Sequence, residues 1–116
     1  MKPYAFSAAS IDQLEPGIKD YVAQGFTPTL ALVFSSVDHN LEEIRKIFAN
    51  HNIDIFGGSS CGEIVNGRVL EKSISVMLLD IDRRNYSVKI FDIDVGLEYQ
   101  SGKNAGDWAL SVFKNP

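Results

Sequence analysis

Residues able to do chemistry gather in one stretch of the chain, between Phe56 and Glu63, with the sequence FGGSSCGE. The stretch holds Ser59, Ser60 and the only cysteine, Cys61. Hydroxyl and thiol groups can act as nucleophiles, and glycines let a ligand approach the main-chain N–H groups. This stretch is therefore the first candidate for a site.

The spacing of Gly57 and Gly62 is that of a phosphate-binding loop. That motif continues with Lys and then Ser or Thr, whereas this chain continues with Glu63 and Ile64. A bound phosphate would meet a carboxylate in place of an ammonium group. A nucleotide site of this type is disfavoured.

The sequence GSSCG, centred on Ser60, also matches the G-x-S-x-G pattern of a hydrolase nucleophile. In those enzymes a helix follows the serine, whereas β-branched and turn-forming residues follow it here. Both histidines, His39 and His51, precede the serine, and with one cysteine they match no compact metal-ligand set. A Ser or Cys hydrolase, or a thiol enzyme using Ser60 or Cys61, stays open as the alternative to a binding site, and the cysteine can equally be a small buried hydrophobe.

The flanking elements predict where the stretch lies. Residues Thr29 to Ser35 are continuously apolar, which indicates a strand buried on both faces, and Ile53 to Gly58 form a second strand. A helix capped by Asn40 joins them, so the strands are expected to be parallel and adjacent. The loop with Ser36 and Asp38 then lies beside the loop that follows the second strand.

The remaining patterns complete an α/β fold, with α+β as the alternative: a mixed β-sheet with a βαβ unit followed by antiparallel strands, and helices packed on the sheet. The Asn66-Gly67 pair is a hairpin turn signal. The other expected elements are a helix over Ile11 to Gln24, a hairpin of Glu63–Val65 with Arg68–Leu70, antiparallel strands over Ser73–Ile81 and Tyr86–Val95, and a helix over Ser101 to Phe113.

Composition limits the function classes. A chain of 116 residues with 45% hydrophobic residues is expected to form a single domain. The 15 acidic and 11 basic residues give a net charge of −4, which disfavours nucleic acid and anionic membranes as partners. One cysteine and no secretory signal at the start favour a cytoplasmic location. No cofactor and no metal site are expected.

The order of these elements resembles the N-terminal domain of the FIST family, found in F-box and intracellular signal transduction proteins. The resemblance runs from about Leu30 to Val95, and its specific parts are Phe34-Ser35-Ser36 and the residues from Gly57 to Ile64. Family members commonly show Gly-Cys-Ser-Thr-x-Gly-Glu-Ile at the second place. Here Gly58 stands where the cysteine is usual, and Cys61 stands where a small apolar residue is more common, so no thiol role carries over.

The resemblance implies a sensory domain of a bacterial signalling protein, binding a small ligand such as an amino acid or a related metabolite. Family domains continue beyond this length, so the chain is expected to be the first part of a longer domain. Its expected partners are the C-terminal half of that architecture or a signalling output domain. An exposed apolar surface is expected to favour a homo-oligomer.

The predicted ligand-binding residues lie on the two neighbouring loops. Serine hydroxyls and loop N–H groups are expected to donate to a carboxylate, and Glu63 or Asp38 to accept from an ammonium group. The residues alone leave a structural reading equally open, in which the serines cap a turn and Glu63 is solvated. The full predicted set is Ser35, Ser36, Asp38, Gly57, Gly58, Ser59, Ser60, Cys61, Gly62 and Glu63.

Overall fold

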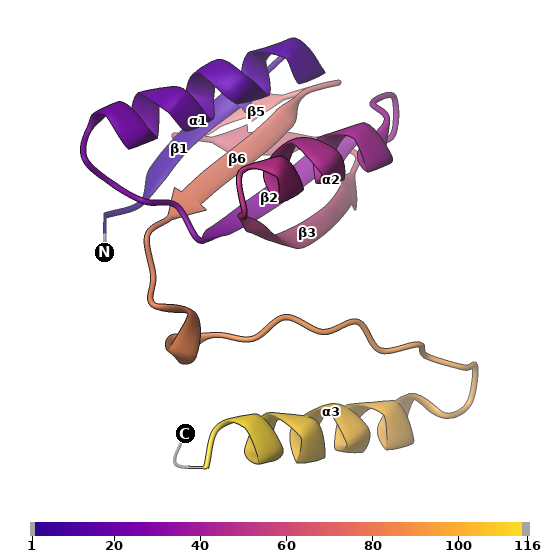
Figure 1. Ribbon diagram of the computed structural model, residues 1–116. Helices are drawn as coiled ribbons and strands as arrows, with labels where there is room; N and C mark the ends of the chain where they lie inside the picture. Colours follow the sequence, from indigo (N-terminus) through magenta and orange to yellow (C-terminus); the bar gives the residue numbers. More distant parts are fainter. Residues whose placement is uncertain (1, 115–116) are drawn as a thin grey trace. The chain divides into compact units, whose positions relative to one another are not determined.

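A computed structural model describes residues 2–114, which divide into two compact units, one ending at Tyr86 and one beginning at Ser87. The first unit is an α/β structure (Figure 1). Its elements in chain order are β1 (Tyr4–Ala8), the 3-10 turn η1 (Ile11–Gln13), α1 (Leu14–Ala23), β2 (Leu30–Ser36), α2 (Leu41–Asn50), β3 (Asp54–Ser60), β4 (Glu63–Val65), β5 (Arg68–Leu70), β6 (Ile74–Leu79) and η2 (Arg83–Asn85).

Four strands form one mixed sheet in the order β1-β6-β2-β3. β2 and β3 are adjacent and parallel, as the single connecting helix predicts, and β6 runs antiparallel to both β1 and β2. β4 and β5 form a separate two-stranded hairpin. The βαβ unit therefore places the carboxyl ends of β2 and β3 side by side at the same end of the sheet.

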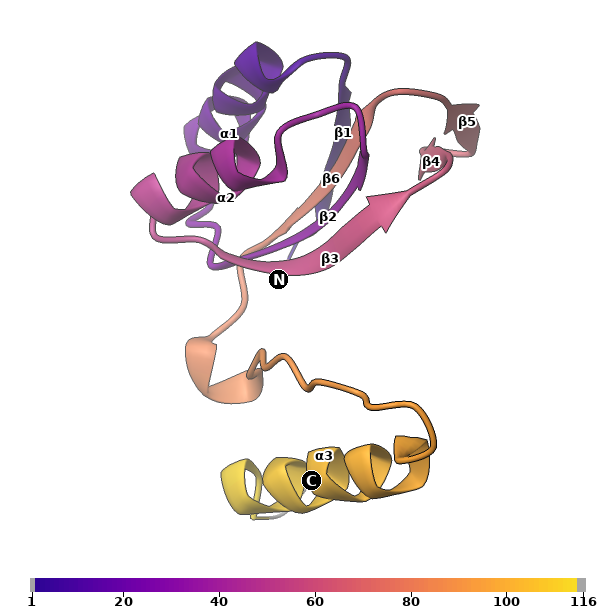
Figure 2. The same cartoon turned by 90° about the vertical axis from the view of Figure 1, so that its right-hand side faces the viewer.

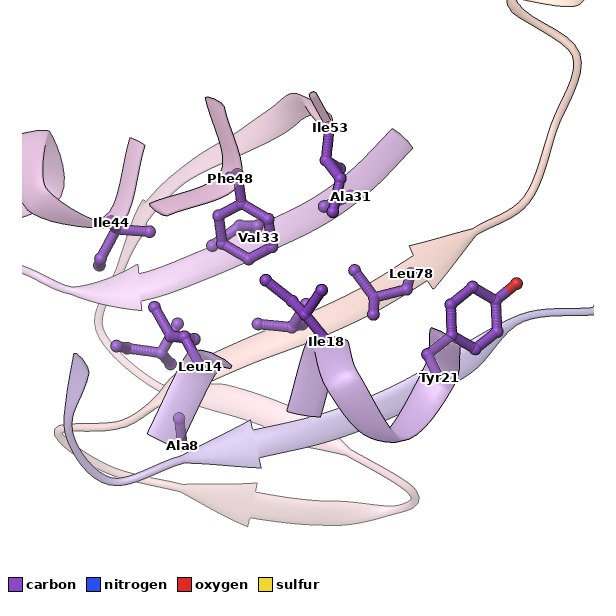
Figure 3. Packing of buried hydrophobic residues seen from close by; sticks show 12 residues of the cluster. Ala8, Leu14, Ile18, Tyr21, Ala31, Val33, Ile44, Phe48, Ile53 and Leu78 are labelled. Atoms are coloured by element: carbon purple, nitrogen blue, oxygen red, sulfur yellow. The ribbon is translucent and has the colours of Figure 1, made fainter. Parts of the chain in front are cut away.

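Both helices of the first unit cover the same face of the sheet, as Figure 2 shows. The core lies between them and the sheet, where Phe48 lies over Val33 and Ile18 belongs to the same buried cluster (Figure 3). The opposite face, which we call the open face, carries Phe34 with 44% of its surface exposed. The prediction that this strand is buried on both faces is not borne out within the first unit, because both helices of that unit lie on the other face.

Local signals set the ends of the elements. The Oδ1 of Asn40 accepts hydrogen bonds from the N–H groups of Glu42 and Glu43 at 3.1 and 3.2 Å, which confirms the predicted cap of α2. Asn66 and Gly67 both have positive φ, at 49° and 78°, which confirms the hairpin turn. The predicted first helix is present, with its opening turn in the 3-10 form.

The second unit holds one helix, α3 (Glu98–Val112), which confirms the predicted C-terminal helix. The strand predicted over Tyr86 to Val95 is wrong, because this segment has no strand structure. Its alternating apolar residues find no ladder partner among the described residues, and Phe91 instead packs edge-on against Trp108 at 5.7 Å between ring centroids. The antiparallel partners of β6 are β2 and the unpredicted strand β1.

Several large apolar side chains are exposed on the first unit, among them Phe34, Phe56 and Met77. Self-association through such a surface stays a prediction. Within residues 2–114, none of the helices has both the length and the apolar character needed to cross a bilayer.

Candidate functional site

The loops that follow β2 and β3 border one cavity, because the parallel register sets Ser36 opposite Ser60 at the ends of the two strands. Cavities beyond the carboxyl ends of parallel strands are frequent ligand sites in α/β proteins. This cavity, which we call the polar cavity, has a volume of about 440 Å³. Its lining residues are Ser36, Val37, Asp38, Ser59, Ser60, Cys61, Glu71 and Lys72.

Five of the ten residues predicted for the site therefore line the polar cavity. On the first loop, the main-chain N–H of Asp38 donates to the Oγ of Ser36 at 3.3 Å. The Oγ of Ser36 also lies 3.4 Å from Oδ2 of Asp38. These contacts fold the loop back on the end of β2 and keep the Asp38 carboxylate at the cavity.

The glycines and Ser35 have other positions. An added Cβ at Gly57 would lie 1.8 Å from the carbonyl oxygen of Val33, so this glycine permits the close approach of β3 to β2. At Gly58 a Cβ would meet open space, and at Gly62 only ordinary contact. Ser35 is buried, and its Oγ donates to the carbonyl of the next residue at 3.0 Å.

Glu63 is buried, with only 1% of its surface exposed. Its Oε1 accepts from the Oγ of Ser60 at 2.8 Å, and its Oε2 accepts from the Oγ and the N–H of Ser73 at 3.1 and 3.3 Å. Burial raises the pKa of Glu63, but the hydrogen bonds from Ser60 and Ser73 together outweigh it and bring the pKa below its ordinary value. Glu63 therefore connects the start of β4 by hydrogen bonds to the last residue of β3, Ser60, and to Ser73 just before β6.

Three residues of the polar cavity were not predicted from the sequence: Val37, within the first loop, and the pair Glu71 and Lys72. Glu71 and Lys72 lie between β5 and β6, and Lys72 has a positive φ of 52°. The Nε2 of His39 lies 2.9 Å from the Lys72 carbonyl oxygen, which links this turn to the loop after β2. The contact joins residues far apart in sequence, so no local pattern signals it.

The geometry also bears on the hydrolase alternative. The hydroxyl of Ser60 donates to Glu63, and the Nε2 of His51 lies 2.8 Å from Oε2 of Glu15. Within residues 2–114, neither histidine forms a hydrogen bond with Ser60 or with Cys61, which is exposed. The structure therefore shows no nucleophile–histidine pair of the kind used in Ser and Cys hydrolases.

Comparison with known proteins gives one finding. The model of the FIST N domain matches residues 29–114, which run from β2 to α3 and include both loops of the polar cavity, while β1 and α1 precede the match. No curated protein and no solved structure matches the chain. Because the family model covers well over half of the sequence, the chain belongs to the FIST N domain family, a family of domains associated with signal transduction.

Proposed function

We propose that this chain is a small-ligand-binding sensory domain and that the polar cavity takes a small zwitterion, with an amino acid as the leading example. The observation that carries the proposal is the charge pattern of the cavity. Its lining residues include one basic residue, Lys72, and two acidic residues, Asp38 and Glu71. Groups of both signs around one small cavity suit a ligand that carries both charges.

The size of the cavity supports the same class of ligand. Its volume of about 440 Å³ lies within the range of roughly 300 to 1,000 Å³ that is typical of small-molecule sites. An amino acid fits this space without a change in the position of the strands.

The hydrogen-bonding groups of the lining indicate which residues contact the ammonium end of the ligand and which contact its carboxylate end. The Ser60 hydroxyl uses its hydrogen on Glu63, so its free lone pairs accept from the ligand's ammonium group, together with Asp38 and Glu71. Ser59 and Lys72 are both exposed and both line the cavity, so both are available to the ligand's carboxylate. Glu63 is a positioning residue for Ser60 in this arrangement.

The same hydrogen bond gives a route from the ligand to the fold. Ser60 ends β3 and Glu63 begins β4, so a ligand that draws on the Ser60 oxygen acts directly on the anchor of the β4–β5 hairpin. A sensory domain requires such a link between the occupied site and a movable element.

Calorimetry of the 116-residue chain tests the proposal with glycine, L-serine, acetate and methylamine. We expect saturable binding of the two amino acids and much weaker binding of acetate and methylamine, each of which carries one charge. Lys72→Gln and Asp38→Asn each remove one charge-assisted contact and are expected to weaken glycine binding about tenfold. Lys19→Gln and Asp20→Asn, at exposed positions of α1, are the matched controls.

Three results would contradict the proposal. The first is glycine affinity that both cavity variants leave unchanged. The second is binding of acetate as tight as that of glycine. The third is turnover of an ester or amide substrate that is lost in Ser60→Ala or Cys61→Ala, which would favour the enzyme alternative.

A further inference from the structure

A second cavity lies on the open face of the sheet, beneath the β4–β5 hairpin. We call it the open-face cavity; its volume is about 210 Å³. It shares no lining residue with the polar cavity. Its lining residues are Ala5, Leu32, Phe34, Ile64, Val65, Asn66, Ser75, Val76 and Met77.

The hydroxyl of Ser75 stands out in this cavity. Ser75 lines the cavity from β6 and is 7% exposed, yet its Oγ forms no hydrogen bond. Across residues 2–114, it is the one buried side-chain oxygen or nitrogen in this condition. A buried hydroxyl without a partner is costly in free energy, so its presence at a cavity wall calls for a partner.

We propose that the open-face cavity binds a small, uncharged, largely apolar molecule whose single polar group hydrogen-bonds to Ser75. The lining contains no charged residue, which excludes an ionic ligand, and most of it is aliphatic or aromatic. Small-molecule sites are commonly apolar, with a few polar groups that orient the ligand. The proposal rests on a different set of residues from the zwitterion site and is independent of it.

The dimensions of the cavity set the size of the ligand. A cavity of about 150 Å³ lined by apolar side chains can hold benzene. The open-face cavity is somewhat larger, and next to it Gly58 leaves open space beside Phe34, its register partner on β2. A ligand with two fused rings or a branched aliphatic body, comparable in size to indole, fits these limits.

Methyl-detected NMR of the 116-residue chain tests this with two probes of nearly equal shape. Indole carries one N–H donor, and indene carries none. We expect both to shift the methyl signals of Leu32, Ile64, Val65 and Met77. Because the indole N–H donates to the Ser75 oxygen, Ser75→Ala is expected to weaken indole binding about threefold to tenfold and to leave indene binding unchanged.

Two further variants make the result specific. Ser7 pairs with Ser75 across β1 and β6 but is exposed and does not line the cavity, so Ser7→Ala is expected to change neither affinity. Ala5→Leu places a larger side chain inside the cavity and is expected to weaken the binding of both indole and indene. Ser75→Ala is expected to unfold at a urea concentration no lower than the parent chain, since it removes an unpaired hydroxyl.

Clear results would overturn the proposal. One is the absence of shifts at these methyl groups up to the solubility limit of indole. Another is an equal effect of Ser75→Ala on indole and indene, which would remove the role of the hydroxyl. A third is unchanged binding of both probes in Ala5→Leu, which would place them outside the open-face cavity.

Discussion

The Oε1 atom of Glu63 accepts a hydrogen bond from the Oγ of Ser60 at 2.8 Å, so a residue that lines the polar cavity is hydrogen-bonded to a buried carboxylate. Ser60 is the last residue of β3, and Glu63 is the first residue of β4. This one contact closes the turn through Cys61 and Gly62. It gives a structural reason for a serine followed three residues later by a glutamate, and it fixes one border of the candidate site.

Loss of the Ser60 hydroxyl is expected to destabilise the fold. Ser60→Ala leaves Oε1 of Glu63 without this partner, and a hydrogen bond to a charged group contributes about 1.5–3 kcal/mol. Urea unfolding should therefore show a lower free energy of unfolding by that amount. Ser59→Ala, at the exposed neighbour, is the control and should change it by less than about 0.5 kcal/mol. Equal losses in the two variants would contradict the role given to the Ser60 contact.

The buried carboxylate also predicts a pH dependence. The pKa of Glu63 is lower in the folded chain than its unfolded value of about 4.3, so folding favours the ionised form. This contribution to stability is fully present above that unfolded value and is lost as the pH falls through the lower, folded pKa. In Glu63→Gln the contribution is absent at every pH.

The measurement is the free energy of unfolding of both chains between neutral pH and about pH 3, a range that begins above the unfolded pKa. The parent chain is expected to be more stable at neutral pH, and the difference should shrink in the acid range. Other carboxylates titrate in both chains and cancel in the difference. A difference that stays constant with pH would show that folding does not lower the pKa of Glu63.

The two central glycines of β3 are expected to differ in their tolerance of a side chain. Gly57→Ala places a Cβ against the carbonyl of Val33, so we expect a loss of at least about 3 kcal/mol or failure to fold. Gly58→Ala enters open space and is expected to be neutral or to stabilise by up to about 1 kcal/mol. Thermal unfolding of both variants measures this, and similar behaviour of the pair would contradict the close strand approach.

Much of the fold around the site follows from local sequence signals. The apolar run of β2, the Asn40 cap and the apolar start of β3 are enough to predict a parallel pair joined by one helix. That pair in turn places the serine-rich loops together, which is why five predicted residues meet at the polar cavity. These three elements can be predicted from local patterns because the residues within each element determine its secondary structure.

The errors arise where distant contacts decide the outcome. Phe91 to Val95 alternates between apolar and acidic residues like a strand, but a strand requires a partner strand, and the described residues supply none. β1 is short and exists through its pairing with β6, about seventy residues later, although Tyr4, Phe6 and Ala8 do alternate inward. Lys72 reaches the polar cavity through contacts far along the chain and gives no local signal.

The helix that joins the two site strands is expected to depend on its cap. Asn40→Ala removes the acceptor for the N–H groups of Glu42 and Glu43 and should lower the free energy of unfolding by about 1 kcal/mol. Asn50→Ala, at the exposed last residue of α2, is the control and should have a smaller effect. Denaturant unfolding of the three chains gives the comparison, and equal effects of the two substitutions would contradict the capping role.

The proposed binding of a doubly charged ligand in the polar cavity can be observed residue by residue in an amide NMR titration of the 116-residue chain with glycine. Glycine is expected to cause saturable shifts concentrated at residues 36–38, 59–61 and 71–72, and acetate or methylamine at the same concentrations should cause none there. In Lys72→Gln the same residues should respond only at about tenfold higher glycine. Shifts that map elsewhere, or acetate shifts equal to those of glycine at these residues, would contradict the claim.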